Sequence, residues 1–240
     1  MIFLHGGWGY EVYPFSRQIA AFERDYRIII PDRTGYGAST RVSRLDPGFH
    51  HAAAVETLAF LDALRIESAL LWGHSDGAVI ATLVALSSPD RVTALVLEAT
   101  HRSAAKPASR RFFEATASDP ASVGKRAAAV LAHDHGNDWM NVVARHSEAW
   151  LAMASETRDF YSGRLGQLRV PVLVIHGEKD PRTEPGELTA LRHALSHATF
   201  HVFSDAGHSP HSEDASADEI TRVAATFLSH VRTTPLRATT

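Results

Sequence analysis

Residues 69–86 read ALLWGHSDGAVIATLVAL, and this stretch decides the fold more than any other part of the chain. Residues 69–72 form a short apolar run typical of a buried strand, whereas residues 78–86 are typical of a helix. Between them lies Gly73-His74-Ser75-Asp76-Gly77, a Gly-x-Ser-x-Gly pattern. Glycines at these places let strand and helix approach closely, so that the serine is presented on a sharp turn. Ser75 is therefore a candidate nucleophile.

Similar strand–helix units repeat along the chain and predict an α/β fold with a mostly parallel sheet. Strands are expected at residues 2–4, 26–30, 69–72, 92–97, 170–175 and 199–203, and helices near 14–22, 51–64, 78–86, 187–195 and 216–231. Residues 101–168 show no strand pattern but helical spacing near 110–117, 122–131 and 137–153. We expect a core of residues 1–100 and 169–232, a helical insertion at 101–168, and a frayed tail at 233–240.

Composition excludes several classes of protein. The 240 residues are 45% hydrophobic and 21% charged, with a formal net charge of −3 and no cysteine. Disulfides, zinc–thiolate sites, iron–sulfur clusters and a cysteine nucleophile are therefore impossible. The absence of a basic excess argues against nucleic-acid binding. No apolar run approaches ~18 residues, so we expect neither a membrane span nor a secretory signal. The expected protein is a cytoplasmic enzyme.

Two later strand ends supply partners for the serine, which needs a base and a group that orients the base. One strand leads into His176-Gly177-Glu178-Lys179-Asp180, and the next leads into Asp205-Ala206-Gly207-His208. Parallel strands place their carboxyl ends at one edge of the sheet. We therefore expect Ser75, Asp180 and His208 to converge there.

With these motifs in order, nearly the whole chain resembles an α/β-hydrolase with a small helical cap. The resemblance also includes His5-Gly6-Gly7-Trp8-Gly9 and the loop Asp32 to Ser39 with Gly35-Tyr36-Gly37. It implies Ser75 as nucleophile, His208 as general base and Asp180 as orienting acid, with the N–H groups of Gly7 and Asp76 as the oxyanion hole. It implies a small-molecule substrate and no cofactor. Residues expected to contact that substrate are Trp8, His74, Trp139 and Trp150.

The beginning of the chain departs from the family pattern. The resemblance implies two strands before the one that ends in His5-Gly6, whereas here that strand starts at Ile2, so the usual first two strands are missing. Residues 26–30 would then form an edge strand, although Ile28-Ile29-Ile30 suits an interior position. We expect a homo-oligomer that covers this strand or a natural start upstream of Met1. A monomer whose own helix or loop shields the edge is the alternative.

Other residues compete for roles in the site. Glu98 ends a strand and is the alternative orienting acid, whereas Glu178 lies too early in its turn, and His211 is interpreted as a satisfied loop histidine. The Asp76 carboxylate would either bond to its own turn or meet a cationic part of the substrate. Basic residues after the fourth strand, Arg102, Lys106, Arg110 and Arg111, fit a solvated helix face better than a carboxylate site.

Metal and nucleotide sites are not expected. His193 with His197, and His133-Asp134-His135, lack a further ligand at a recognised spacing, and a solvated face explains both. Gly35-x-Gly37 lacks the third glycine of a dinucleotide site, and the chain contains neither Gly-Lys-Ser nor Gly-Lys-Thr.

The sequence thus predicts a serine hydrolase that cleaves a small ester, lactone or thioester through an acyl-enzyme. Carbon–carbon bond hydrolysis and perhydrolysis by the same triad remain open, as does a hydrolase-fold ligand-binding protein with little turnover. Activity is expected to rise with pH through one ionisation near neutrality, that of His208. The identity of the substrate stays open.

Overall fold

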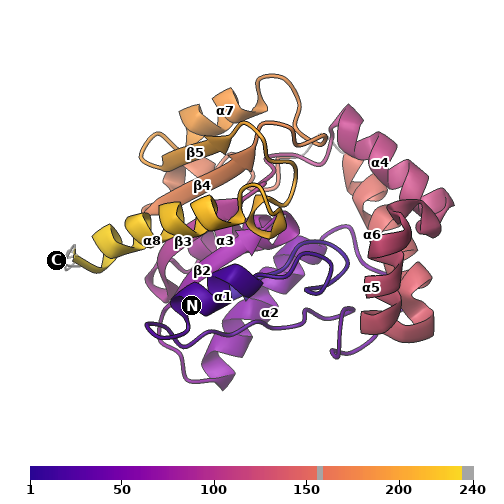
Figure 1. Cartoon of the computed structure of the whole chain (residues 1–240), viewed down its shortest axis with the longest axis horizontal. Helices are drawn as coiled ribbons and strands as arrows, with labels where there is room; N and C mark the ends of the chain where they lie inside the picture. The colour runs from indigo at the N-terminus through magenta and orange to yellow at the C-terminus, as the bar shows by residue number, and fades with distance from the viewer. Residues whose placement is uncertain (156–158, 234–240) are drawn as a thin grey trace.

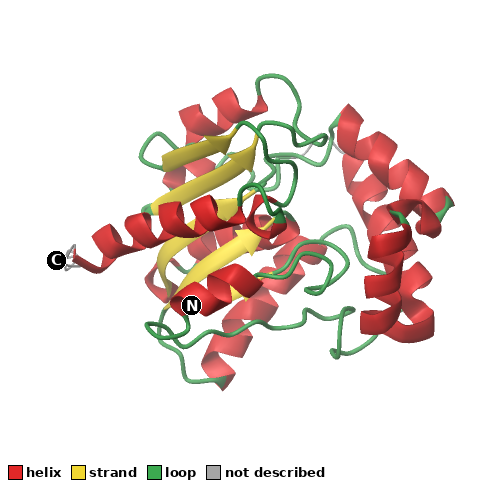
Figure 2. Cartoon of the chain, in the orientation of Figure 1, coloured by secondary structure: helices red, strands yellow, loops and turns green. Residues whose placement is uncertain are grey.

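Five parallel strands form one sheet in the order β1-β2-β3-β4-β5 in the computed structural model, which describes residues 1–155 and 159–233. The strands are β1 (Ile2–Leu4), β2 (Ala69–His74), β3 (Val92–Glu98), β4 (Val172–Gly177) and β5 (Thr199–Phe203). In the central register Leu71 pairs with Ile2 on one side and Leu95 on the other. The predicted parallel sheet is confirmed, and its carboxyl ends share one edge (Figures 1 and 2).

Helices cover both faces of the sheet. One face packs on α1 (Ser16–Phe22) and α8 (Ala217–Thr233), and the other on α2 (Phe49–Ala63), α3 (Asp76–Ser87) and α7 (Glu187–Ala194). Neighbouring residues of β2 alternate between these layers, because Trp72 belongs to the first and Leu71 to the second. Strands buried on both faces require continuous apolar runs. The apolar strands of the sequence are therefore the framework that carries the turns at their carboxyl ends.

The predicted strand at residues 26–30 is wrong. Only Ile29 pairs with β1, as a single parallel bridge to Ile2. The Ile29 N–H donates to the Met1 carbonyl oxygen, and the Ile29 carbonyl oxygen accepts from the Phe3 N–H, both at 3.0 Å. Parallel pairing uses alternate residues, so the next donor would be residue 31, which is a proline without an N–H. The ladder therefore stops after one residue, and the oligomer expected to cover it stays a prediction.

Three helices lie between β3 and β4 in the sequence and beyond the carboxyl ends of the strands in space (Figure 1). They are α4 (Pro107–Ser118), α5 (Lys125–His135) and α6 (Trp139–Ala154), which we call the α4–α6 unit. The helix expected at 122–131 begins later, because residues 120–123 form a 3-10 turn and Gly124 takes a φ of +91° before α5. The α4–α6 unit therefore faces the edge of the sheet at which the turns with the candidate site residues lie.

Two further expectations concern the ends and exterior of the molecule. No helix in the described part of the chain is long and apolar enough to cross a membrane. Of the tail expected to fray, residue 233 ends α8 and residues 234–240 lie outside the described residues.

Candidate functional site

Ser75 occupies a sharp, strained turn between β2 and α3. Its φ of +54° and ψ of −116° are rare for a residue with a side chain. A Cβ on Gly73 would lie 2.2 Å from the Gly77 carbonyl oxygen, and one on Gly77 would lie 1.9 Å from the Leu4 carbonyl oxygen. Both glycines are required because backbone passes where a side chain would sit. The turn therefore presents the Ser75 hydroxyl at the carboxyl edge of the sheet.

Asp180 and His208, from the turns after β4 and β5, are in direct contact. The Nδ1 atom of His208 lies 2.7 Å from Asp180 Oδ2, while Asp180 Oδ1 accepts from the Arg182 N–H at 2.9 Å. Asp180 therefore keeps the proton on Nδ1 and leaves Nε2 with a lone pair. Nε2 is buried and has no hydrogen-bond partner among the described residues. Such a nitrogen is suited to accept the Ser75 proton. Hydrogen bonds between a base and its nucleophile often form or shorten only when substrate binds.

The charge states of this pair follow from their surroundings. Burial, reinforced by the Arg182 guanidinium, lowers the pKa of His208 to about 4 in spite of the neighbouring Asp180 carboxylate. Burial opposes ionisation of Asp180, but His208 and Arg182 hold the pKa of that carboxyl well below its usual range. At neutral pH His208 is uncharged and Asp180 is charged, as a base and its orienting acid must be. Burial therefore places the pKa of His208 below the neutral range expected from the sequence, and this changes the predicted dependence of activity on pH.

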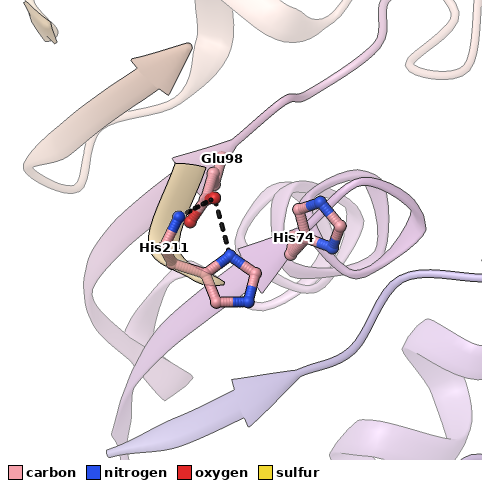
Figure 3. Close-up of side chains that lie close together, drawn as sticks. All are labelled: His74, Glu98 and His211. Atoms are coloured by element: carbon pink, nitrogen blue, oxygen red, sulfur yellow. Dashed lines mark hydrogen bonds and ion pairs between the residues drawn. The ribbon is translucent and has the colours of Figure 1, made fainter. Parts of the chain in front are cut away.

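Glu98 and His211 form a second acid–histidine pair, which Figure 3 shows together with His74. Glu98 Oε1 lies 2.7 Å from His211 Nδ1 and accepts the His211 backbone N–H at 3.0 Å. His211 Nε2 faces the Tyr13 carbonyl oxygen at 2.9 Å. Both ring nitrogens of His211 thus have oxygen partners within hydrogen-bond distance. Neither nitrogen is free to act as a base toward Ser75, and Glu98 holds His211 instead of His208.

His74 completes a group with Glu98 and His211 that has the residue types of a metal site. Their potential ligand atoms lie within 4.8 Å of one another, the one such group in the described part of the chain. A metal ion needs unprotonated nitrogens. Because both His211 nitrogens already have hydrogen-bond partners, the group fits a hydrogen-bonded network and not a metal site.

The two expected oxyanion donors come from different elements. Asp76 is the first residue of α3, where an N–H has no partner within the helix. Gly7 follows β1, and a Cβ there would lie 2.5 Å from Nε2 of His146 on α6. Only a glycine lets the α4–α6 unit come so close to this turn. A Cβ on Gly6 would likewise lie 2.9 Å from His74 Nδ1, so the turn fits tightly over the serine.

The Asp76 side chain joins the turn to distant elements. Its Oδ1 lies 2.9 Å from His50 Nε2 on α2 and accepts from Trp150 Nε1 on α6 at 3.1 Å. Its Oδ2 lies 3.5 Å from His146 Nε2 and 3.9 Å from the Arg33 guanidinium. Burial opposes ionisation, but His146, His50 and Arg33 hold the pKa of Asp76 well below its usual range. The carboxylate therefore makes neither a local turn bond nor an open cationic site, but links the elbow to α2 and α6.

A small cavity lies at Ser75, with about 10 Å³ of space, enough for one water molecule. Its lining residues are Gly7, Trp8, Tyr13, His74, Ser75, Phe113, His146 and Arg182. Two of the expected substrate contacts, Trp8 and His74, therefore lie at the cavity. A much larger hollow of about 690 Å³ between β5 and α8 contains none of the predicted site residues.

The other two expected contacts lie outside the cavity. Trp150 is buried, bonds to Asp76 and stacks on Phe113 with the ring centroids 4.9 Å apart. Trp139 packs beside Trp8 in a small apolar cluster. In place of these two, the structure brings Tyr13, Phe113, His146 and Arg182 to the serine. Two of the four had a signal in the sequence: Phe113 is one of the aromatic residues of the helical insertion, and Arg182 stands two residues after Asp180 in the acid turn.

Two basic residues that were expected on a solvated face, His135 and Lys106, are buried instead. His135 is buried, with Nε2 2.7 Å from the Trp8 carbonyl oxygen, whereas His133, His193 and His197 are exposed. Lys106 is also buried and bonds to both carboxylate oxygens of Glu187. The other three basic residues after β3 lie apart from the cavity, with Arg102 on Asp159, Arg110 near Glu114, and Arg111 exposed.

Two residues near the motifs, His5 and Glu178, lie apart from the cavity. His5 is buried in its own turn, where Nδ1 lies 2.7 Å from the Gly6 carbonyl oxygen and Nε2 accepts the Arg33 N–H at 3.2 Å. Glu178 is exposed. Neither residue lines the cavity at Ser75.

Comparisons with known proteins agree with this architecture. A model described as the alpha/beta hydrolase family matches residues 1–222. Serine hydrolase BPHL of Mus musculus is 23% identical over 235 residues, covering 95% of this chain and 78% of the relative. The 2-hydroxy-6-oxo-6-phenylhexa-2,4-dienoate hydrolase of Comamonas testosteroni is 29% identical over 255 residues, covering 95% and 87%.

Solved structures show the same fold. A thermophilic esterase from Thermogutta terrifontis has a TM-score of 0.74 at 22% identity, covering 97% of this chain and 90% of the esterase. The enol-lactonase from Burkholderia xenovorans has a TM-score of 0.70 at 22% identity, covering 95% and 90%. At such identities the likeness concerns the fold.

Proposed function

The chain belongs to the alpha/beta hydrolase family and is a hydrolytic enzyme, and on that premise we propose that it is a serine hydrolase acting through Ser75. The proposed substrates are small esters, lactones or thioesters, and the proposed intermediate is an acyl-enzyme. The 2.7 Å contact between Asp180 and His208, at the edge of the sheet that carries Ser75, is the observation that carries this proposal. It supplies a neutral, oriented base, the requirement that a serine nucleophile cannot meet alone.

The reaction follows from these atoms in two stages. Ser75 Oγ attacks the carbonyl carbon while its proton passes to His208 Nε2, and Asp180 stabilises the imidazolium that forms. The N–H groups of Gly7 and Asp76 receive the oxyanion. His208 then returns the proton to the leaving group as the carbonyl–oxygen or carbonyl–sulfur bond breaks. In the second stage water attacks the acyl-enzyme, with His208 again taking and returning the proton.

The wider surroundings belong to the same proposal. We take the α4–α6 unit as the cap over the site, because α6 supplies His146 to the cavity and Trp150 to Asp76. The chemistry needs no cofactor, since every proton and electron pair moves between protein, substrate and water. A cytoplasmic location, a homo-oligomeric state and the lack of nucleic-acid or membrane partners stay predictions.

Carbon–carbon bond hydrolysis is the second candidate function. The relative that shares 29% identity over 95% of this chain is named a hydrolase of 2-hydroxy-6-oxo-6-phenylhexa-2,4-dienoate. A second relative, from Paraburkholderia phymatum, is named a hydrolase of 2-hydroxy-6-oxononadienedioate and the related trienedioate. The same triad would serve both reactions, so the substrate must be tested directly. Perhydrolysis and ligand binding with little turnover have no observation of their own.

A substrate panel tests the proposal. p-Nitrophenyl acetate, a small lactone, a small thioester and a 2-hydroxy-6-oxo dienoate would be assayed with wild type and Ser75→Ala, after circular dichroism shows that the variant is folded. We expect turnover of the ester, lactone or thioester, reduced about 10⁴-fold or more by Ser75→Ala. Faster turnover of the dienoate would favour carbon–carbon hydrolysis, and no Ser75-dependent turnover of any compound would favour a binding protein.

A further inference from the structure

Arg182 is the cation of the Ser75 cavity, and its guanidinium makes no direct ion pair with a carboxylate in the described part of the chain. It is half-buried and lines the cavity together with Ser75 and Gly7. No ion pair or hydrogen bond of its guanidinium to a described residue is found, and only its backbone N–H contacts Asp180. The guanidinium lies over the Phe112 ring, with Cζ 5.0 Å from the ring centroid. An aromatic face holds a guanidinium in place without using its hydrogen-bond donors.

Other cations around the site are matched to carboxylates. Arg33 lies 3.9 Å from Asp76 and donates to the Gly6 carbonyl oxygen at 2.6 Å. Lys106 lies 2.9 Å from Glu187, and on α6 Arg145 lies 3.0 Å from Asp138. Arg182 differs from these three cations because its guanidinium has no carboxylate within ion-pair distance.

Asp180 does not fill this role for Arg182. Its Oδ2 is held by His208 at 2.7 Å and its Oδ1 by the Arg182 backbone N–H at 2.9 Å. Both oxygens therefore serve to fix the catalytic histidine and the turn. A guanidinium with free donors that lines the cavity of the nucleophile is suited to bind a planar anion in bidentate fashion.

We propose that Arg182 binds a carboxylate of the substrate, so that the enzyme prefers short esters or lactones bearing a carboxylate over neutral ones of the same size. This inference rests on the proposed function of Ser75. Ser75 and Arg182 both line the cavity, so a carboxylate held by Arg182 lies only a few bonds from the carbonyl that is attacked. The cavity has room for about one water molecule in this structure, so the substrate must also widen it on binding. Half-esters of short dicarboxylic acids have this form.

A matched pair of substrates tests the proposal. Monomethyl glutarate carries the carboxylate, and methyl 4-carbamoylbutanoate is its neutral amide of nearly the same shape. We expect wild type to have the higher kcat/KM for the carboxylate, measured by acid release at constant pH. In Arg182→Gln the ratio of the two kcat/KM values should fall about 10- to 100-fold, the loss typical of a charged hydrogen bond. Arg111→Gln removes the same charge from an exposed position of α4 and should leave the ratio unchanged.

An unchanged ratio in Arg182→Gln, or a wild-type preference for the amide, would overturn the proposal. If neither ester shows Ser75-dependent turnover, the proposed function fails, whereas Ser75-dependent turnover without preference removes the role of Arg182 alone. Should Arg182→Gln not fold, inhibition of the wild-type enzyme by glutaramate, which carries one carboxylate, and by pentanediamide, which carries none, gives the same comparison. Tighter inhibition by glutaramate is expected, and equal inhibition would contradict the proposal.

Discussion

Two histidines on neighbouring turns each contact a carboxylate at 2.7 Å, yet their free nitrogens differ. The Nε2 atom of His208 has no hydrogen-bond partner in the described structure, whereas the Nε2 atom of His211 contacts the Tyr13 carbonyl oxygen. A base needs a lone pair, so only the Asp180–His208 pair can take a proton from serine. The difference lies in hydrogen bonding and not in residue type, and the sequence left Glu98 open as an alternative acid for that reason.

Replacing the two acids separately tests this assignment. Asp180→Asn should lower kcat/KM for p-nitrophenyl acetate about 10⁴-fold, because an amide no longer holds the required tautomer of His208. Glu98→Gln should lower kcat/KM far less and act mainly on stability, since it removes the carboxylate that holds the buried His211 ring and backbone N–H. A greater loss of activity in Glu98→Gln would show that the acid follows β3.

The dependence of activity on pH tests the state of His208. Its pKa is lowered to about 4, so the base is already neutral throughout the range from pH 8 to pH 6. We expect kcat/KM of the wild type to stay level over that range, with tryptophan fluorescence reporting that the protein remains folded. A fall by half near pH 6.5 would mean that His208 has the pKa of an exposed histidine.

At the scale of elements, the contact between α3 and β1 depends on Gly77. A methyl group there would overlap the Leu4 carbonyl oxygen, which is backbone and cannot turn aside. Gly77→Ala should therefore lower the free energy of unfolding by about 3 kcal/mol, measured by urea unfolding. Gly48→Ala is the control, because its added methyl group meets only the exposed Asp46 side chain, and it should change stability by less than about 1 kcal/mol. Equal effects of the two changes would contradict the close approach.

Most elements could be predicted from the sequence because their signals are local. The strand at residues 69–72 is a short apolar run, and the turn at Ser75 has glycines where backbone must pass. Residues 26–30 had the same apolar signal, but Pro31 removes the donor that would extend the ladder. Whether an apolar run forms a strand depends on its hydrogen bonding to a neighbouring strand. The run at residues 26–30 could therefore not show by itself that the ladder would stop.

The surroundings of the site could not be predicted, because they join distant parts of the chain. Asp76 is held by His50 from α2 and by Trp150 from α6. Neither spacing follows a motif, since each contact depends on how α2 and the α4–α6 unit pack. Arg182 could have been noticed beside Asp180, but its free guanidinium is a property of the packed site. Motifs thus predicted the triad candidates, and tertiary packing determined the cavity.

At the scale of the whole molecule, many histidines are buried in the neutral form. Burial lowers the pKa of each of seven, namely His5, His50, His74, His101, His146, His176 and His208. Once unfolded they bind protons near pH 6.5. Below that pH the unfolded state binds more protons than the folded state, so acid destabilises the fold.

The free energy of unfolding should therefore fall steeply between pH 7.5 and pH 5. Each of these histidines contributes up to about 1.4 kcal/mol per pH unit below pH 6.5, until its pKa in the folded state is reached. Urea unfolding at pH 7.5, 6.5 and 5.5 would measure the slope. A free energy of unfolding that stays constant over this range would show that these side chains reach solvent in the folded state.

The central claim is that Ser75 is the activated nucleophile of the molecule. The most direct measurement is reaction of the folded protein with a fluorophosphonate, followed by mass spectrometry of its peptides. We expect one modified residue, Ser75. Labelling should be lost in Ser75→Ala and greatly slowed in Asp180→Asn. Robust labelling of another serine while Ser75 stays unmodified would contradict it.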